Sequence, residues 1–407
     1  MAAQQPLAAR WRREAGACKV YRVLTDFVAH NFRTFDRLEL PRLGRVNLIV
    51  GKNNVGKSSL LDALRLYLSN ADAAVIRELL DERDETVVSL DGEEPRLRLE
   101  ALFHGWVSTG SKDDIRLGPS GSADNQVVIQ SRALRRRSPR AAFGEEDKPS
   151  YVIVEPGLDD DPQFVPGLRI LAAGVSRMFP SDYFSLDRKW WGRGSGLPRP
   201  MYVSSRGMSL ADVARCWDFV SLRDSEQRVI DCLQMIAPVE RITLVERTLR
   251  TGTRVPWVRV QGKPFPMPLK SMGDGMSRIF QFGLAMELAA MNEKSGRADQ
   301  PELPGLAGTQ RLGSATILID EIENGIHYSA LPDLWRFIFN SAKRSNVQVF
   351  ATSHSLDCIK AFSVASREDN GSEGVLIRLE QQGEDIVPVT IDEQDLFWLT
   401  ENELEMR

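Results

Sequence analysis

The sequence contains little cysteine and no long apolar run. Only four cysteines occur among 407 residues, and Cys18, Cys216, Cys232 and Cys358 are too widely separated for the spacing of a metal site. We therefore expect small buried thiols, as is usual in a reducing cytoplasm. No uninterrupted apolar stretch approaches the roughly 18 residues of a membrane helix, and residues 1–19 lack the apolar segment of a secretory signal. These absences predict a cytoplasmic protein with no membrane partner.

Charge of either sign is not in excess. The chain carries 56 acidic and 52 basic residues, for a formal net charge of −4. This balance excludes a global field that would attract a polyanion, so any contact with nucleic acid has to be local. Internal repeats and long heptad runs are absent too, and the length indicates two or three domain-sized units.

Three continuously apolar stretches predict strands that are buried on both faces. They read "RVNLIV" (45–50), "SATILIDEIE" (314–323) and "NVQVFATSHS" (346–355). Helical spacing follows from residue 58 and recurs over 276–293 and 332–344, while 209–236 is typical of two short helices or one longer one. Further strands are expected over 20–40, 86–90, 96–106 and 125–130, with a hairpin over 241–262.

This alternation predicts an α/β fold with a β-rich N-terminal lobe, a parallel-sheet core and an inserted α+β region. We expect an N-terminal part over 20–84, the insertion over 85–240 and a C-terminal part over 241–407.

The stretch "GKNNVGKS" fits the pattern G-x-x-x-x-G-K-[ST], with a buried strand before it and a helix after it. Gly51 and Gly56 permit backbone torsions that a Cβ would block. Loop N–H groups then converge on phosphate oxygens, Lys57 reaches the terminal phosphates, and the Ser58 hydroxyl is suited to Mg²⁺. The expected nucleotide-binding residues are Gly51, Asn53, Asn54, Gly56, Lys57, Ser58 and Ser59.

Two further strand ends carry polar side chains to the edge where parallel sheets hold their ligands. Asp320 is expected beside the magnesium shell, together with Ser58, and Glu321 is placed to polarise the attacking water. His354 is our candidate to sense the γ-phosphate or to position the water. For His327 a structural and a functional role remain equally open.

Four segments together resemble the ABC-type ATPase heads of the SMC/RecF/OLD group. They are "HNFRTFDRLEL" (30–40), "LKSMGDGMSRIF" (269–280), "LIDEIENGIHYS" (318–329) and "FATSHS" (350–355). The sequence is most similar to compact prokaryotic AAA-type ATPases related to the OLD (overcoming lysogenization defect) nucleases. The resemblance covers about 20–70 and 240–360 and is weak over 85–235.

The resemblance implies that two heads close over ATP as a homodimer, each giving its phosphate loop to one site and its signature to the other. By position, Ser271, Gly273 and Gly275 correspond to that signature, although the transporter form L-S-G-G-Q is absent and Asp274 adds a negative charge. Independently, this segment precedes a strong helix, whose N-terminus favours anions. The residues after His354 are too few for the TOPRIM nuclease domain of OLD proteins, which implies a separately encoded effector.

The leading hypothesis is therefore an ATP- and Mg²⁺-dependent dimeric switch in a DNA-linked or phage-defence process, where the biological setting rests on resemblance. The alternative is a RecF-like ATPase that binds DNA directly, and a transporter subunit, a kinase or a GTPase is disfavoured. The features that favour DNA binding are five arginines that suit phosphates and two tryptophans that suit bases. These residues are Arg132, Arg135, Arg136, Arg137, Arg140, Trp190 and Trp191.

Overall fold

The computed structural model describes residues 23–87, 96–106, 114–136, 151–154, 164–181, 199–247, 252–295, 315–369 and 373–391. Its centre is a six-stranded sheet whose first five strands are parallel and whose last strand is antiparallel. In spatial order these are β11 (Met201–Val203), β15 (Thr316–Ile319), β16 (Gln348–Thr352), β3 (Val46–Val50), β17 (Gly374–Gln382) and β18 (Asp385–Ile391).

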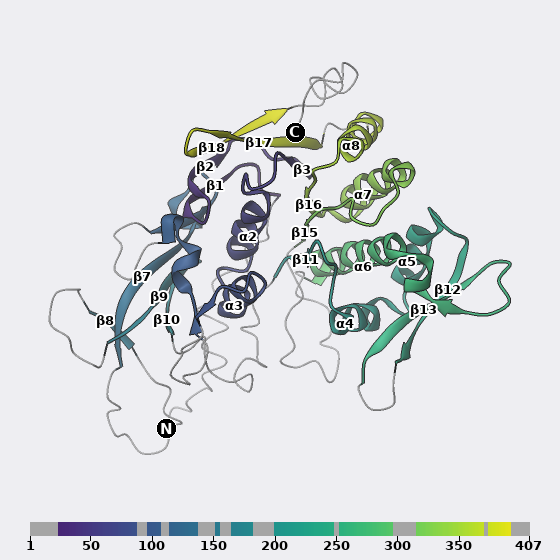
Figure 1. Ribbon diagram of the computed structural model, residues 1–407, viewed down its shortest axis with the longest axis horizontal. Helices are drawn as coiled ribbons and strands as arrows, with labels where there is room; N and C mark the ends of the chain where they lie inside the picture. Colours follow the sequence, from purple (N-terminus) through teal and green to yellow (C-terminus); the bar gives the residue numbers. More distant parts are fainter. Residues whose placement is uncertain are drawn as a thin grey trace, which may run out of the picture.

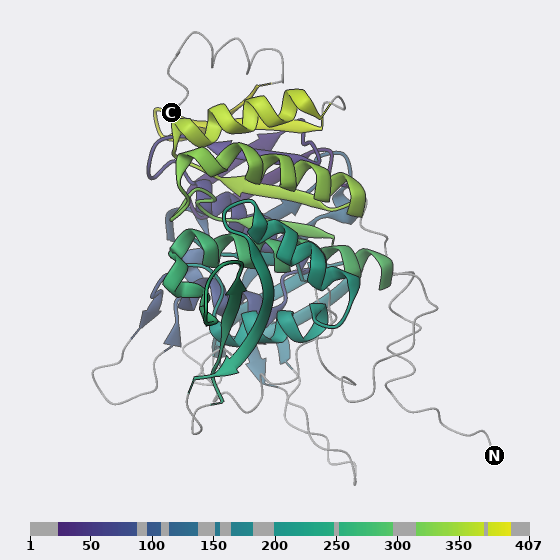
Figure 2. The ribbon, with the colours of Figure 1, turned by 90° about the vertical axis from the view of Figure 1, so that its right-hand side faces the viewer.

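Both faces of this core sheet are covered, so its strands are apolar throughout. Alternate residues point to opposite faces: Leu48 and Val50 pack into one hydrophobic cluster and Ile49 into the other. The first face carries α4 (Leu210–Val220), α5 (Asp224–Gln234), α6 (Asp274–Ser295), α7 (Leu331–Ser345) and α8 (Leu356–Glu368). Figure 2 shows α6, α7 and α8 stacked across it. The second face carries α2 (Lys57–Leu68) and α3 (Ala73–Asp81).

An antiparallel sheet covers α2 and α3 from the other side (Figure 1). Its strands run in the order β10 (Val175–Pro180), β9 (Phe164–Ala172), β7 (Val127–Arg136), β6 (Ile115–Gly118), β1 (Phe27–Phe32) and β2 (Phe35–Leu40), and β8 (Tyr151–Val154) pairs with β7. The two sheets meet where β18 contacts β2. Region 85–240 therefore supplies strands to both sheets, because β11 joins the core.

The remaining elements are short. A small sheet consists of β12 (Val239–Glu246), β13 (Arg254–Val260) and β14 (Met267–Pro268), and β4 (Thr86–Val87) pairs with β5 (Arg96–Leu97). The 3-10 turns are η1 (Leu99–Leu102), η2 (His104–Trp106), η3 (Ala123–Asn125), η6 (Leu269–Met272) and η7 (Tyr328–Ala330). Within the described ranges, no helix is long and apolar enough to cross a membrane.

The predicted α/β class, with its β-rich N-terminal lobe and parallel core, is confirmed, and so are the hairpin β12–β13 and the two helices α4 and α5. One strand prediction is wrong: over 96–106 only Arg96–Leu97 is a strand, and the rest is 3-10 turns. The buried residues there are Leu99, Ala101, Leu102 and Phe103. The three largest, Leu99, Leu102 and Phe103, are three and four residues apart, which is helical spacing, so the turns bury them together where a strand would put them on opposite faces.

Candidate nucleotide-binding site

Three parallel strands deliver the site to one edge of the core sheet. The phosphate loop follows β3, the acidic turn 320–323 follows β15, and the segment 353–355 follows β16. Because β15, β16 and β3 are neighbours in the sheet and point the same way, their carboxyl ends converge there. Three sequence segments that are far apart in the chain therefore form one site.

The phosphate loop has the backbone that its glycines predict. Gly51 and Gly56 have φ values of +146° and +87°, which disfavour side chains. A Cβ would also lie 2.6 Å from the Leu379 carbonyl oxygen at Gly51 and 2.6 Å from Thr34 Oγ1 at Gly56. Among the other predicted loop residues, Asn53 and Asn54 are exposed at the tip, and Ser59 is buried in the first turn of α2. The loop is thus shaped to present backbone N–H groups at a helix N-terminus.

Lys57 folds back over its own loop. Its Nζ donates to the carbonyl oxygens of Gly51 at 2.7 Å and Lys52 at 2.8 Å. Burial lowers the pKa of the Lys57 ammonium, while the nearby carboxylates of Glu321, Asp320 and Glu323 raise it. A partly desolvated cation with only carbonyl partners is suited to exchange them for phosphate oxygens.

Asp320 and Ser58, which were predicted as oxygen ligands of Mg²⁺, lie side by side. Ser58 Oγ lies 3.3 Å from both carboxylate oxygens of Asp320, which is 8% exposed. Such hard oxygen donors fit Mg²⁺, which usually takes one or two carboxylates and completes its shell with water and phosphate. The described residues contain no group of three or more His, Cys, Asp or Glu side chains that could hold a metal ion.

Thr352, at the end of β16, connects the acidic residues to the sheet. Its Oγ1 donates to Asp320 Oδ1 at 2.6 Å and accepts the backbone N–H of Glu321 at 2.8 Å. The side chain is fully buried. Sequence analysis missed this role, although a hydroxyl at a strand end next to an acidic strand is a signal that could have suggested it.

Burial raises the pKa of Asp320; Glu321 adds to the rise and the Thr352 hydrogen bond opposes it. A folded-state pKa above the unfolded value means that stability is highest at low pH and falls as pH rises through the folded pKa. At neutral pH the ionised Asp320 therefore destabilises the nucleotide-free protein. We expect Asp320→Asn to raise the melting temperature by a few degrees at about pH 7.5, and the gain to vanish near pH 4.

Calorimetry of the nucleotide-free protein checks this prediction. The matched control is Asp36→Asn on β2, where the aspartate is exposed. An unchanged or lower melting temperature for Asp320→Asn at neutral pH would contradict the electrostatic account.

Glu321 has an unusual conformation for a non-glycine residue, with φ at +48°. Its Oε2 accepts a hydrogen bond from Asn324 Nδ2 at 2.5 Å. The buried Arg278 of α6 donates through Nη2 to the carbonyl oxygens of Asp320 and Glu321, each at 3.0 Å. Asn324 thus holds the carboxylate and Arg278 holds the backbone of the turn, which suits a group that has to orient a water molecule. The sequence analysis did not assign Asn324 or Arg278.

His354 and His327 lie in different surroundings. His354 Nδ1 is 3.2 Å from Glu323 Oε1, and its side chain is 51% exposed at the same sheet edge. His327 caps η7, with Nδ1 at 2.8 Å from Ser329 Oγ and its ring against Tyr328. These contacts favour the structural role for His327.

Ser271 and Gly273 come just before α6, Gly275 lies in its first turn, and α6 packs on the sheet face opposite α2. Ser271 and Gly273 are exposed, and a Cβ at Gly273 would meet no atom within 4 Å. Gly275 is buried, and it lies so close to the turn after β15 that a Cβ there would be 2.5 Å from the carbonyl oxygen of Gly325. The N-terminus of α6 therefore faces outward while its next residue packs against the acidic turn.

The described contacts give little support to the prediction that arginine and tryptophan side chains bind nucleic acid. Arg132 pairs with Asp114 at 3.2 Å, and Arg135 is exposed at the end of β7. The side chain of Arg136, together with Arg137, Arg140, Trp190 and Trp191, lies outside the described residues. Direct DNA binding therefore stays a prediction.

Three cysteines are free and buried, as predicted. Burial raises the pKa of the Cys216 and Cys358 thiols to about 12 and raises that of Cys232 as well. Buried, protonated thiols are unreactive, which leaves them a packing role. Cys18 lies outside the described residues.

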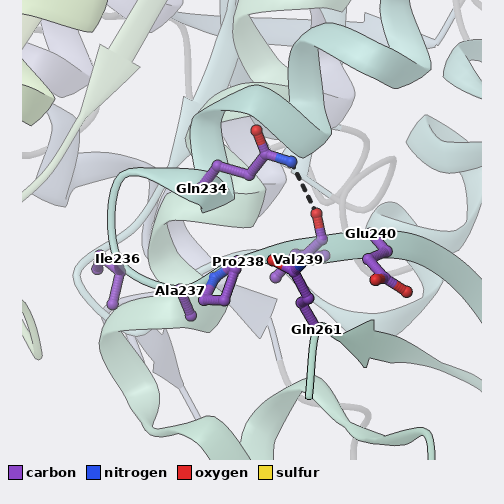
Figure 3. Close-up of a pocket in the computed structure, with 7 residues that line it drawn as sticks. All are labelled: Gln234, Ile236, Ala237, Pro238, Val239, Glu240 and Gln261. Carbon is purple, nitrogen blue, oxygen red and sulfur yellow. Dashed lines mark hydrogen bonds between the residues drawn. The ribbon is translucent and has the colours of Figure 1, made fainter. Parts of the chain in front are cut away.

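A separate hollow lies where α5 leads into β12 (Figure 3). Gln234 Nε2 donates to the Val239 carbonyl oxygen at 2.9 Å across its rim. The lining residues are Gln234, Ile236, Ala237, Pro238, Val239, Glu240 and Gln261. Glu240 is the one ionisable group among them, so this hollow lacks the acid–base pairs of the nucleotide site.

Comparison with known proteins agrees with this geometry. A family model described as "AAA domain, putative AbiEii toxin, Type IV TA system" matches residues 259–357, which include the signature, the acidic strand and His354. The chain is also 37% identical over 79 residues to the uncharacterized protein MJECL11 of Methanocaldococcus jannaschii, covering 19% of this chain and 68% of that protein. The chain belongs to the AAA-domain family of P-loop ATPases.

Two other relatives are matched over short segments. An ATP/GTP phosphatase of Helicobacter pylori is 38% identical over 93 residues, which cover 22% of this chain. The uncharacterized protein MJECL10 of M. jannaschii is 46% identical over 55 residues, or 12% of this chain. The matches span about a quarter of the length of each of these two relatives.

Two SMC head domains are among the solved structures that match this chain. The SMC head domain from Thermotoga maritima is 12% identical with a TM-score of 0.41, covering 91% of this chain and 100% of that one. The SmcHead bound to the C-winged helix domain of ScpA is 10% identical with a TM-score of 0.46, covering 91% and 97%. Both scores are below 0.5, so the fold assignment rests on the strand order and the phosphate loop described above.

Proposed function

We propose that this ATPase binds and hydrolyses Mg²⁺·ATP and acts as a nucleotide-gated dimeric switch. The observation that supports the proposal is the convergence of Lys57, the Ser58–Asp320 pair and Glu321 at one sheet edge. Ser271 and Gly273 are exposed just before α6, which packs on the sheet face opposite α2. The name of the H. pylori relative, an ATP/GTP phosphatase, supports the same chemistry.

Each group of the site has one task in this reaction. Lys57 and the loop N–H groups would hold the β- and γ-phosphates, and Ser58 with Asp320 would hold Mg²⁺, which supplies positive charge to offset that of the phosphates when it is bound. Glu321 orients a water molecule in line with the γ-phosphorus and accepts its proton as the water oxygen bonds to that phosphorus and the bond from the phosphorus to the ADP oxygen breaks. His354 lies at the mouth of the site, where it contacts the departing phosphate. ADP and inorganic phosphate leave as products.

Dimerisation follows from the exposure of the signature. Ser271 and Gly273 offer a hydroxyl and an open backbone at the start of a long helix, which suits an anion. Their own chain keeps them on the face opposite the helix of the phosphate loop, so the anion is the γ-phosphate held by a second copy. Two ATP molecules then contact both heads and shift the population toward the closed dimer, and hydrolysis releases it.

Replacing Ser271 with arginine tests the shared site. The exposed Ser271 is not part of the phosphate loop, so we expect nucleotide affinity of the monomer to change by less than about twofold. Steady-state ATP turnover should fall by about 100-fold, because the bulky cation blocks closure on the partner's phosphate. Fluorescent-nucleotide titration and phosphate-release assays measure the two effects.

The matched control is Ser176→Arg, a substitution at an exposed serine on β10. It should leave binding and turnover unchanged. If Ser271→Arg hydrolyses ATP as fast as the unchanged protein, the signature does not act on the nucleotide and the dimeric site is wrong.

The matched family model names a toxin of a type IV toxin–antitoxin system, which is compatible with a role in phage defence. We infer that the closed dimer controls a separately encoded effector, such as a TOPRIM-type nuclease. Co-purification of the effector in ATP but not in ADP is the expected result, and ATP turnover with and without duplex DNA separates this switch from a RecF-like protein.

A further inference from the structure

Successive residues of the turn that follows β15 form hydrogen bonds with the end of β16. Thr352 Oγ1 donates to Asp320 Oδ1 at 2.6 Å. The two backbone N–H groups after Asp320 donate to Thr352, one to its Oγ1 at 2.8 Å and one to its carbonyl oxygen at 3.1 Å. The last connection joins Glu323 to His354. The acidic turn and the histidine segment therefore form one hydrogen-bonded unit.

Glu323 makes this last connection with a single oxygen. Its Oε1 accepts the backbone N–H of His354 at 2.9 Å and lies 3.2 Å from the Nδ1 of the same residue. The Glu323 side chain is 10% exposed, whereas that of His354 is 51% exposed. The carboxylate is thus the buried anchor, and the imidazole is the part that meets solvent or a ligand.

The three carboxylates of the turn have different partners. Asp320 is bonded to Ser58 and Thr352, and Glu321 to Asn324. The partner of Glu323 is His354, and its second oxygen, Oε2, is buried without a hydrogen-bond partner. A buried carboxylate oxygen without a partner is costly, so its position calls for an explanation beyond packing.

The contact of the other oxygen, Oε1, with the imidazole of His354 gives the carboxylate a role at this position. When Nδ1 faces a carboxylate, it carries the ring proton and donates it, which leaves the Nε2 lone pair on the opposite side of the ring. Carboxylates hold imidazoles in one tautomer and one orientation in this way in catalytic and metal sites. A histidine that was fixed through Nδ1 would present Nε2 to the mouth of the nucleotide site.

We propose that Glu323 is the positioning residue of His354: it fixes the Nδ1–H tautomer and directs Nε2 toward the γ-phosphate end of the site. Its effect on hydrolysis rests on the proposed function, whereas the tautomer does not depend on it. Because Glu323 belongs to the same turn as Asp320 and Glu321, any displacement of the acidic turn also moves the histidine. The position of the histidine is thereby linked to that of the catalytic carboxylate.

Long-range proton–nitrogen NMR of the imidazoles tests the tautomer in the nucleotide-free full chain. The sequence has four histidines, and the His354 signal is identified by its loss in His354→Gln. At a pH where the imidazole is neutral, we expect Nδ1–H in the unchanged protein and in Glu323→Gln, whose amide oxygen still accepts a hydrogen bond. Glu323→Ala should show the Nε2–H tautomer that free imidazole side chains prefer. An unchanged His354 signal in Glu323→Ala would overturn the proposal.

Hydrolysis supplies a second readout. Glu323→Ala should lower kcat for ATP by about 10- to 100-fold while KM changes by less than about twofold, and Glu323→Gln should recover most of the loss. Glu323→Ala combined with His354→Ala should be no slower than His354→Ala alone. A fully additive loss in the double variant, or a normal kcat in Glu323→Ala, would overturn the positioning role.

Control variants show whether a negative result concerns the positioning role of Glu323 or ATP hydrolysis itself. Glu240→Ala, at an exposed glutamate on β12, should leave kcat and the His354 signal unchanged. Should the unchanged protein hydrolyse no ATP, the proposed function fails, and the NMR result alone then decides the tautomer. If Glu323→Ala does not fold, Glu323→Gln and His354→Gln carry the kinetic test, and we expect kcat to fall in His354→Gln and to stay near normal in Glu323→Gln. A normal kcat in His354→Gln, or a loss in Glu323→Gln as large as that in His354→Gln, overturns the positioning role.

Discussion

Substituting Lys57 with alanine is expected to weaken ATP binding by about 100-fold or more. The ammonium of Lys57 is held over the phosphate loop by the carbonyl oxygens of Gly51 and Lys52. In the complex it exchanges these neutral partners for phosphate oxygens, and each charge-assisted hydrogen bond contributes about 1.5–3 kcal/mol. Two such bonds account for the expected loss, since 1.4 kcal/mol corresponds to a factor of ten. Calorimetric titration with a non-hydrolysable ATP analogue measures it.

The melting temperature shows whether Lys57→Ala binds ATP weakly because a phosphate-binding group is missing or because the protein is unfolded. Burial lowers the pKa of Lys57, so the folded state disfavours its charged form. A base with a lowered folded pKa costs stability as pH falls below that pKa. At neutral pH the nucleotide-free Lys57→Ala protein should therefore melt at the same temperature as the unchanged protein or higher.

Lys52 provides the matched control for this experiment. It lies in the same loop, its side chain is exposed, and its contact with Lys57 uses the backbone carbonyl. Lys52→Ala should bind the analogue with less than about a threefold change in affinity. Equal losses in the two variants would mean that general positive charge, not the specific lysine, attracts the nucleotide.

The parts of the fold that sequence reasoning reached are those with strong local patterns. The strands at Val46–Val50, Thr316–Ile319 and Gln348–Thr352 are buried on both faces, so continuous apolar runs mark them. The phosphate loop is recognisable because its glycines and lysine have fixed spacing. Strand ends of a parallel core share an edge, which is why Asp320, Glu321 and His354 could be placed together before any coordinates.

The features that the sequence did not predict depend on residues that are distant along the chain. Segment 96–106 was predicted as a strand because it alternates over a few residues, but its burial against α3 and the N-terminal sheet favours 3-10 turns. The roles of Thr352, Glu323 and Arg278 depend on hydrogen bonds across 31–43 positions of the chain, which no local pattern encodes. The paired strands β17 and β18 close the core sheet and were not predicted either.

The second large effect is expected for Glu321→Gln, which should retain ATP binding and lose hydrolysis. A glutamine cannot accept the proton of the attacking water, and loss of a general base costs about 10²- to 10⁴-fold in rate. The amide oxygen still accepts the hydrogen bond from Asn324 Nδ2, and the backbone contacts with Arg278 and Thr352 do not involve the side chain. The fold and the nucleotide affinity should therefore be preserved.

This variant also reports on the dimer. With hydrolysis blocked, ATP remains between the heads, so light scattering in Mg²⁺ and ATP should give about twice the mass of the chain, and ADP should give a single chain. Glu240→Gln is the control, because this exposed glutamate on β12 should change neither the turnover nor the mass. A Glu321→Gln protein that is saturated with ATP and still monomeric would contradict the proposed dimer but not the proposed hydrolysis. The catalytic residue would stand, and the exposed Ser271 and Gly273 would need another ligand.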